Sequence, residues 1–301
     1  MRQEVKFKNF TWINIIEPTN ADLDFLTEKY DFHHLAIEDC RLNIQQPKID
    51  DYDDYLFMVF HLPRYIKSSK RTVALELNVF LGKNYLITLH NGDLKPLNKY
   101  FEQISKNISQ LKYSSPAYLL YEILNTSFNY CFPMLEKISG NLDRVEDELY
   151  LDQSRKTLEE LSIIAQDIIN FRRIIRPQRY FIEDLEEIKT KFIDEDLEFY
   201  YEDIADKIDR IWELLDSHKE VVDVLQRTNE SLLTQRLNEV MKTLTIISVI
   251  MLPLTVITGF YGMNVAGLPF AESRFSTEIV FGFMVLVSVT MLFYFRKRSW
   301  L

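Results

Sequence analysis

Residues Thr243–Asn264, TLTIISVIMLPLTVITGFYGMN, begin a run without any charged side chain that ends only at Ala271. As a helix, Thr243–Phe260 would rise about 27 Å, close to the roughly 30 Å hydrocarbon core of a membrane. A second charge-free segment, Ile279–Phe295, would rise about 26 Å. Both segments are apolar on every face, which disfavours a buried hairpin of a soluble protein. We therefore expect two transmembrane helices, at about 243–262 and 279–295.

Basic residues flank the two segments unequally. Five of them stand just before the first segment or just after the second: Arg236, Lys242, Arg296, Lys297 and Arg298. The connecting loop, 263–278, contains one base, Arg274. Because positive charge stays on the cytoplasmic side, this asymmetry predicts a multi-pass protein of the cell (inner) membrane with both termini cytoplasmic and the loop external. The basic C-terminus is also suited to contact anionic membrane lipid.

The rest of the chain has the composition of an acidic soluble protein. The 301 residues include 45 Asp and Glu and 35 Lys and Arg, a net charge of −10. Residues 243–301 hold only two of the acids and four of the bases, so residues 1–242 carry −12. This charge argues against nucleic-acid binding, and two cysteines are too few for a disulfide framework. The chain lacks a GxxxxGK[ST] phosphate loop and a nucleophile–base pair, so we expect no organic cofactor and no enzyme.

The acidic portion divides into a mixed region, 1–113, and a helical region, 114–242. Alternating patterns in the first predict strands at 5–8, 12–15, 55–61, 73–81 and 85–90, and helices at 22–30 and 96–108. In the second, helical spacing covers 119–149 and 157–175, with an interruption expected near Pro177. A long helix from about 195 to 260 would rise roughly 96 Å and enter the membrane.

The long helix carries an apolar seam with steps of four and three residues. The seam includes Ile204, Ile208, Ile211 and Leu215. Such a seam packs against another helix, either within the same chain or in a neighbouring subunit.

The first span also has residues suited to lining a pore. They follow one helical stripe: Asn238, Met241, Leu244, Ser248, Leu252, Thr255 and Gly259. Two helices of one chain cannot enclose a pore, so a transport function requires an oligomer. Hydroxyls in membrane helices also bond to the preceding turn or join helices, and the stripe alone leaves these readings open.

The first span ends at its external side with Tyr261-Gly262-Met263-Asn264. Alone, this tetrapeptide fits a helix C-cap, because Gly and Asn readily adopt positive φ. The sequence resembles the CorA family of divalent-cation channels, whose hallmark is Tyr-Gly-Met-Asn closing the first of two C-terminal spans. The likeness extends to other segments and so covers nearly the whole chain: 33–39, 46–55, 238–242, 244–247, 253–255 and 295–301.

The resemblance implies an α+β membrane protein that forms a homopentameric channel for Mg²⁺ influx, with Co²⁺ and Ni²⁺ as further cargo. The implied parts are a cytosolic α/β/α domain (1–113), a helical bundle and stalk (114–242) and the two spans (243–301). Tyr261, Gly262, Met263 and Asn264 become the selectivity filter, and the stripe becomes the pore lining. Leu252 stands where many relatives have methionine.

This assignment agrees with the chemistry of the ion. Mg²⁺ demands octahedral oxygen ligands and loses water reluctantly, so a ring of Asn264 carboxamides could hold it through its waters. Rings of Met241, Leu244 and Leu252 would form apolar constrictions that gate by dewetting. Entry into a negative cytosol gains about 4.6 kcal/mol per divalent ion at 100 mV.

Acidic residues gather on the long helix, where Asp203 and Asp206 lie one turn apart. Most such clusters are solvated surface. The resemblance implies instead that cytosolic carboxylates at subunit interfaces bind Mg²⁺ and close the channel. Asp203 aligns with one such position, whereas Ile66 occupies the place of its usual acidic partner. Asp203 and Asp206 are therefore the candidate regulatory ligands.

Two other functions remain open from the sequence. The first is zinc transport by a protein of the same fold, against which Met263 argues. The second is a membrane-anchored scaffold with the helical region as a spacer, which would have no reason to place Asn264 at the mouth of the span.

Overall fold

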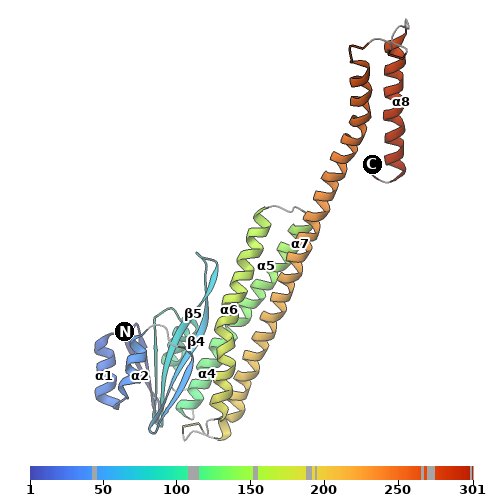
Figure 1. Ribbon diagram of the computed structural model, residues 1–301. Helices are drawn as coiled ribbons and strands as arrows, with labels where there is room; N and C mark the ends of the chain where they lie inside the picture. The colour runs from blue at the N-terminus through green and yellow to red at the C-terminus, as the bar shows by residue number, and fades with distance from the viewer. Residues whose placement is uncertain are drawn as a thin grey trace. The chain divides into compact units, whose positions relative to one another are not determined.

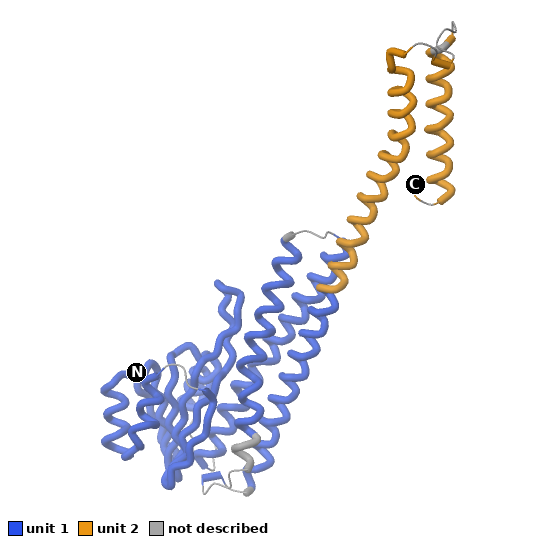
Figure 2. Tube along the Cα trace, viewed as in Figure 1, with its two compact units in different colours: residues 1–225 blue, residues 226–301 orange. Residues whose placement is uncertain are grey.

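The computed structural model describes the chain except for residues 43–45, 108–114, 152–154, 188–191, 194, 266–267, 270–274, 299 and 301. The chain divides into two compact units, residues 1–225 and 226–301 (Figure 2). The predicted boundary between residues 113 and 114 lies outside the described residues, as does part of the predicted loop 263–278.

The first unit contains a six-stranded sheet. Its strands are β1 (Arg2–Lys6), β2 (Thr11–Ile16), β3 (Lys48–Tyr52), β4 (Tyr55–Ile66), β5 (Arg71–Gly82) and β6 (Tyr85–His90), in the order β1-β2-β6-β5-β4-β3 (Figure 1). The β2–β6 pair is parallel and the other pairs are antiparallel. Each predicted strand overlaps an observed one. Strand β3, KIDDY, was not predicted, because its polar sequence shows no strand pattern.

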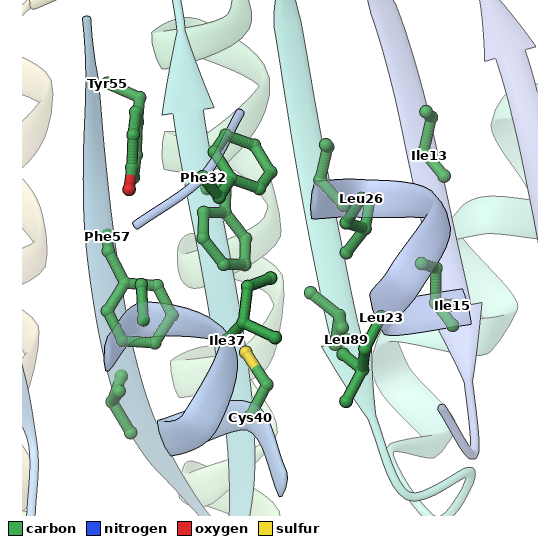
Figure 3. Close-up of a cluster of buried hydrophobic side chains, with 14 residues drawn as sticks. Ile13, Ile15, Leu23, Leu26, Phe32, Ile37, Cys40, Tyr55, Phe57 and Leu89 are labelled. Carbon is green, nitrogen blue, oxygen red and sulfur yellow. The ribbon is translucent and has the colours of Figure 1, made fainter. Parts of the chain in front are cut away.

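Two helices, α1 (Asn20–Tyr30) and α2 (His34–Arg41), cover one face of this sheet. The side chains of this core lie between helices and strands (Figure 3). Leu26 and Ile37 are buried here with Ile15 and Phe57. Phe32, between the two helices, stacks on Phe80 of β5 with ring centroids 4.1 Å apart.

The opposite face of the sheet is covered by helices that follow it in the chain. They are α3 (Lys95–Asn107), α4 (Pro116–Asn129) and α6 (Arg155–Glu187), and α5 (Cys131–Leu151) packs on α4 and α6. The ring of Trp12 meets Phe101 of α3 edge-on at 4.7 Å, and Phe60 meets Phe181 of α6 at 4.6 Å. Because both faces are covered, every residue from Tyr55 to Phe60 is buried. The expected α/β/α layering is confirmed.

The long helix α7 (Glu198–Tyr261) follows a short 3₁₀ turn, Glu195–Leu197. Its apolar seam is buried within this single chain, since Ile204, Ile208, Ile211 and Leu215 are all inaccessible to solvent. Two ion pairs join α6 to α7: Arg172 to Asp216 at 2.5 Å, and Arg179 to Asp209. Of the two partners that the sequence left open for the seam, the structure provides the intramolecular one.

The interruption expected near Pro177 is wrong, because α6 continues through it from Arg155 to Glu187. A proline inside a helix loses one backbone hydrogen bond and costs about 3 kcal/mol. The apolar stripe nevertheless runs on both sides of Pro177, with Ile174, Ile175, Phe181 and Ile182 all buried. Burial of such side chains, each contributing about 1.5–3 kcal/mol, outweighs the lost bond.

Candidate functional site

The second unit consists of the C-terminal part of α7 together with α8 (Ser276–Lys297) (Figure 2). Both helices contain an 18-residue window that is long and apolar enough to cross a membrane. Only 6% of each window is buried within the chain. A core helix of a soluble protein would be mostly buried, so the exposed apolar surface indicates a lipid environment or further subunits.

The predicted pore-lining stripe occupies an uncovered face of α7. Met241, Leu244 and Leu252 are 57–67% exposed, and Asn238, Ser248, Thr255 and Gly259 are exposed as well. At about 100° per residue, the stripe and the covered positions lie on opposite faces of the helix. The covered positions are Ile246, which is buried, and Ile250, Pro253, Leu254 and Ile257, which are half-buried. The single chain therefore leaves the stripe open to another molecule.

Hydroxyl groups along this helix are bonded to the helix itself. The Ser248 hydroxyl donates to the carbonyl of Leu244 at 2.9 Å, and the Thr255 hydroxyl donates to the carbonyl of Met251 at 2.9 Å. Each hydroxyl hydrogen is thereby used, while oxygen lone pairs remain available as acceptors. The two hydroxyl groups can therefore face water or the hydration shell of a cation without leaving an unpaired donor in the membrane.

The predicted filter begins where α7 ends. The Gly262 N–H donates to the carbonyl of Thr258 at 2.8 Å, and the next N–H, of Met263, donates to Phe260 at 3.4 Å. A Cβ atom at Gly262 would lie 2.9 Å from the Thr258 carbonyl oxygen, closer than real Cβ atoms come to backbone. Glycine is thus required at position 262, because the backbone there lies close to the Thr258 carbonyl. Neither Gly262 nor Asn264 has positive φ, which excludes the left-handed C-cap that the sequence allowed.

Asn264 lies beyond the helix end with an exposed side chain. Its carboxamide has no hydrogen-bond partner within the part of the chain that the structure describes. Met263 beside it is 46% exposed. The amide is therefore free to bind water or ions.

Asp203, the first candidate regulatory ligand, lies on α7 in the first unit with its side chain 48% exposed. It forms an ion pair with Lys207, one turn further along, and accepts a hydrogen bond from the Tyr121 hydroxyl at 3.4 Å. Burial, followed by the nearby Asp203 carboxylate, raises the pKa of Tyr121 to about 12, so the phenol stays protonated and donates. Neither partner was predicted: Lys207 could be found from its i+4 spacing, but Tyr121 is 82 residues away in the sequence.

Asp206, the second candidate, is exposed on the same helix and has no ion pair among the described residues. The structure brings these two acids onto one helix surface. Within the described part of a single chain, however, no three His, Cys, Asp or Glu side chains are grouped so as to hold a metal ion. A complete cation site at Asp203 or Asp206 would need ligands from elsewhere.

Comparison with known proteins bears on these features. Residues 7–297 match the family described as CorA-like Mg²⁺ transporter protein. The chain belongs to this family. It is 28% identical over 293 residues to the cobalt/magnesium transport protein CorA of Thermotoga maritima, covering 97% of this chain and 83% of the relative. It superimposes on the complete structure of the CorA magnesium transporter from Methanocaldococcus jannaschii with a TM-score of 0.89 at 21% identity, covering 99% and 94% of the two chains.

Zinc transporters are also among the relatives of this chain. The zinc transport protein ZntB of Pectobacterium carotovorum is 27% identical over 183 residues, which is 60% of this chain and 55% of that protein. The chain is thus a CorA-type divalent-cation transporter located in a membrane, from a family of ion transporters rather than enzymes. The predicted fold class, with its α/β domain, long helix and two apolar C-terminal helices, is confirmed.

Proposed function

We propose that this chain forms a homopentameric channel that admits Mg²⁺ to the cytosol, with Co²⁺ and Ni²⁺ as further cargo. The exposed stripe from Asn238 to Gly259, on the face of α7 opposite its covered side, carries the proposal. Five such stripes around one axis would line a water-filled path, and the α8 helices would face lipid. The number five rests on the family resemblance.

In this proposal the filter is the external ring of Tyr261, Gly262, Met263 and Asn264. Neutral carboxamide oxygens of Asn264 suit a cation that keeps its water shell, because they accept hydrogen bonds from that water without trapping the ion. Rings of Met241, Leu244 and Leu252 below would exclude water when narrow and so close the path. The membrane potential, negative inside, drives entry of the divalent cation. The basic flanks of the two spans favour a cytosolic location for both termini, and with them for residues 1–242.

Residues 1–113 and 114–242 would then act as the regulatory part. We infer that cytosolic Mg²⁺ closes the channel by binding Asp203 and Asp206 with ligands of an adjacent subunit, because one chain lacks a full set of ligands in its described residues. Asp203 is already paired with Lys207, so Mg²⁺ must compete with an ammonium group. This competition should set the concentration at which the channel closes.

Substitutions at this pair test the regulatory part. In reconstituted channels, Asp203→Asn should raise the cytosolic Mg²⁺ concentration needed for half-closure, and Lys207→Gln should lower it, each by about threefold to tenfold. The matched control is Asp147→Asn, an exposed acid on α5. Closure at an unchanged Mg²⁺ concentration in both variants would remove Asp203 from the sensor.

The transported ion is tested with purified protein in liposomes under an imposed voltage, inside negative. Flux of Mg²⁺ should exceed that of Zn²⁺ and should increase with voltage. Zinc is the second candidate because ZntB proteins are among the relatives. Faster Zn²⁺ flux would support it, and absence of any divalent flux would contradict the channel function altogether.

A further inference from the structure

A large cavity of the first unit takes no part in the proposed channel. Its volume is about 760 Å³, and it lies between the end of the β4–β5 hairpin, the start of α3, and helices α5 and α6. None of the proposed filter, pore-lining or regulatory residues lines it. Its size falls within the range of about 300–1,000 Å³ that is typical of small-molecule sites.

The wall of the cavity is basic, although residues 1–242 as a whole carry −12. Six bases line it: Arg64, Lys67, Lys70, Lys95, Lys137 and Arg144. It has three acids, of which Asp93 pairs with Arg64, and Glu160 pairs with Arg144 at 2.8 Å. The third, Asp167, is buried and accepts a hydrogen bond from the Thr72 N–H.

This pairing leaves the lysines in excess. Lys67, Lys70, Lys95 and Lys137 are exposed at the cavity, and none of them forms an ion pair with the residues that the structure describes. Four ammonium groups around one concave surface repel one another, and the low-dielectric walls strengthen their field. Binding of a polyanion would relieve that repulsion.

Buried apolar side chains of the sheet and the helices also line the cavity, and we call them its floor. They include Leu62, Leu75, Ile138 and Ile164. Tyr65 adds an aromatic ring, over which the Lys137 ammonium lies at 5.1 Å from the centroid. A flat or apolar ligand body could therefore enter below the lysines, where inorganic phosphate would leave the floor unused.

We propose that this cavity binds an organic polyanion with an aromatic or apolar body, the chemical class of nucleoside polyphosphates. The phosphate groups would contact the four unpaired lysines, and the base would lie on the apolar floor beside Tyr65. The proposal does not depend on the channel function, since the cavity shares no residue with the filter, the pore-lining stripe or the regulatory acids.

The test uses the full chain in detergent micelles and metal-free ATP in EDTA, with binding measured by isothermal titration calorimetry. ATP should bind saturably. Adenosine and inorganic tripolyphosphate should each bind at least about tenfold more weakly, because each lacks one half of the recognised chemistry. No binding of ATP would overturn the proposal. Tripolyphosphate binding as tightly as ATP would overturn the assignment of the floor and hence of the ligand class.

Two charge reversals locate the site. Lys137→Glu should weaken ATP binding at least about tenfold. Lys83→Glu, at an exposed lysine in the β5–β6 turn that does not line the cavity, should leave ATP binding unchanged. Equal weakening by both variants would mean that ATP binds through general surface charge, and no weakening by Lys137→Glu would place ATP elsewhere. Circular dichroism spectra that match wild type confirm that both variants are folded.

Discussion

The N-terminal and C-terminal parts of helix α7 differ in what covers their apolar side chains. In the first unit, the seam residues Ile204, Ile208, Ile211 and Leu215 are buried against the same chain. Two arginines of α6, Arg172 and Arg179, pair with acids of α7. In the second unit, Leu244 and Leu252 are apolar but exposed. The N-terminal part therefore has its partners within the chain, whereas the C-terminal part has apolar surface that only lipid or other subunits can cover.

This difference explains why the charge pattern changes along the helix. In water, a helix keeps one apolar stripe and solvates the remaining faces with charged side chains. In a membrane, every face must be uncharged, and polar groups must be bonded internally, as the hydroxyls of Ser248 and Thr255 are. The uncharged helix surface opposite its covered side is then free to line a path for ions.

Matched truncations at the two ends give the largest expected effect on stability. Ile211→Ala should lower the free energy of unfolding of the first unit by about 2–5 kcal/mol, because it opens a cavity at a fully buried position. Leu252→Ala, at a side chain that is 67% exposed, should lower the free energy of unfolding of the second unit by less than about 0.5 kcal/mol. Tryptophan fluorescence during denaturation measures this difference, since Trp12 and Trp212 lie in the first unit and Trp300 lies in the second. Equal effects would show that the two ends do not differ as described.

The second prediction is that the stability of the first unit depends on pH through a buried histidine. Burial lowers the pKa of His90 from 6.5 to about 4, so the folded protein keeps this side chain neutral. Between these values the unfolded chain binds more protons, so stability falls as pH falls. Between pH 6.5 and 5 the loss from His90 is about 2 kcal/mol. The span Thr243–Phe260 has no titratable group and should show no such dependence.

Denaturation of the wild type and of His90→Gln at both pH values measures this term. His218, whose pKa is also lowered by burial, stays in both proteins and contributes equally to each. The stability of the variant should therefore fall by about 2 kcal/mol less than that of the wild type. Parallel pH profiles would show that His90 is not kept neutral by the fold.

A third prediction concerns two glycines of the second unit. Gly262→Ala should reduce divalent-cation flux at least about tenfold, equivalent to roughly 1.4 kcal/mol, because its Cβ would displace the Thr258 carbonyl at the mouth. Gly282→Ala, on α8, meets no atom within 4 Å and should conduct normally. Liposome flux assays of both variants compare them directly. Normal flux in Gly262→Ala would mean that the helix end is not part of the conduction path.

Local sequence patterns predicted most of the fold, and long-range pairing accounts for the rest. The apolar positions of Tyr55–Phe60 and of Ile204–Leu215 follow strand and helix periods and were recognisable. The parallel contact of β2 with β6 joins segments about 70 residues apart and leaves no local signal. The interruption predicted at Pro177 was wrong because proline lowers helix stability only locally. Burial of Phe181 and its neighbours outweighs that loss of stability.

The candidate site divides in the same way. The order of Tyr261, Gly262, Met263 and Asn264 after an apolar span was readable from the sequence, and its role as a filter stays a prediction. The contact of Tyr121 with Asp203 and the basic cavity beside Tyr65 depend on tertiary packing. Local sequence spacing does not predict contacts between residues of separate helices and strands.

The proposed filter depends on the Asn264 carboxamide, and Mg²⁺ flux through Asn264→Ala measures that dependence. The variant is reconstituted in liposomes beside wild type and Asn129→Ala, an exposed amide on α4. Size-exclusion chromatography should show the same oligomer for all three. Mg²⁺ uptake should be abolished in Asn264→Ala and normal in Asn129→Ala. Undiminished Mg²⁺ uptake by an intact Asn264→Ala oligomer would show that Asn264 does not form the filter.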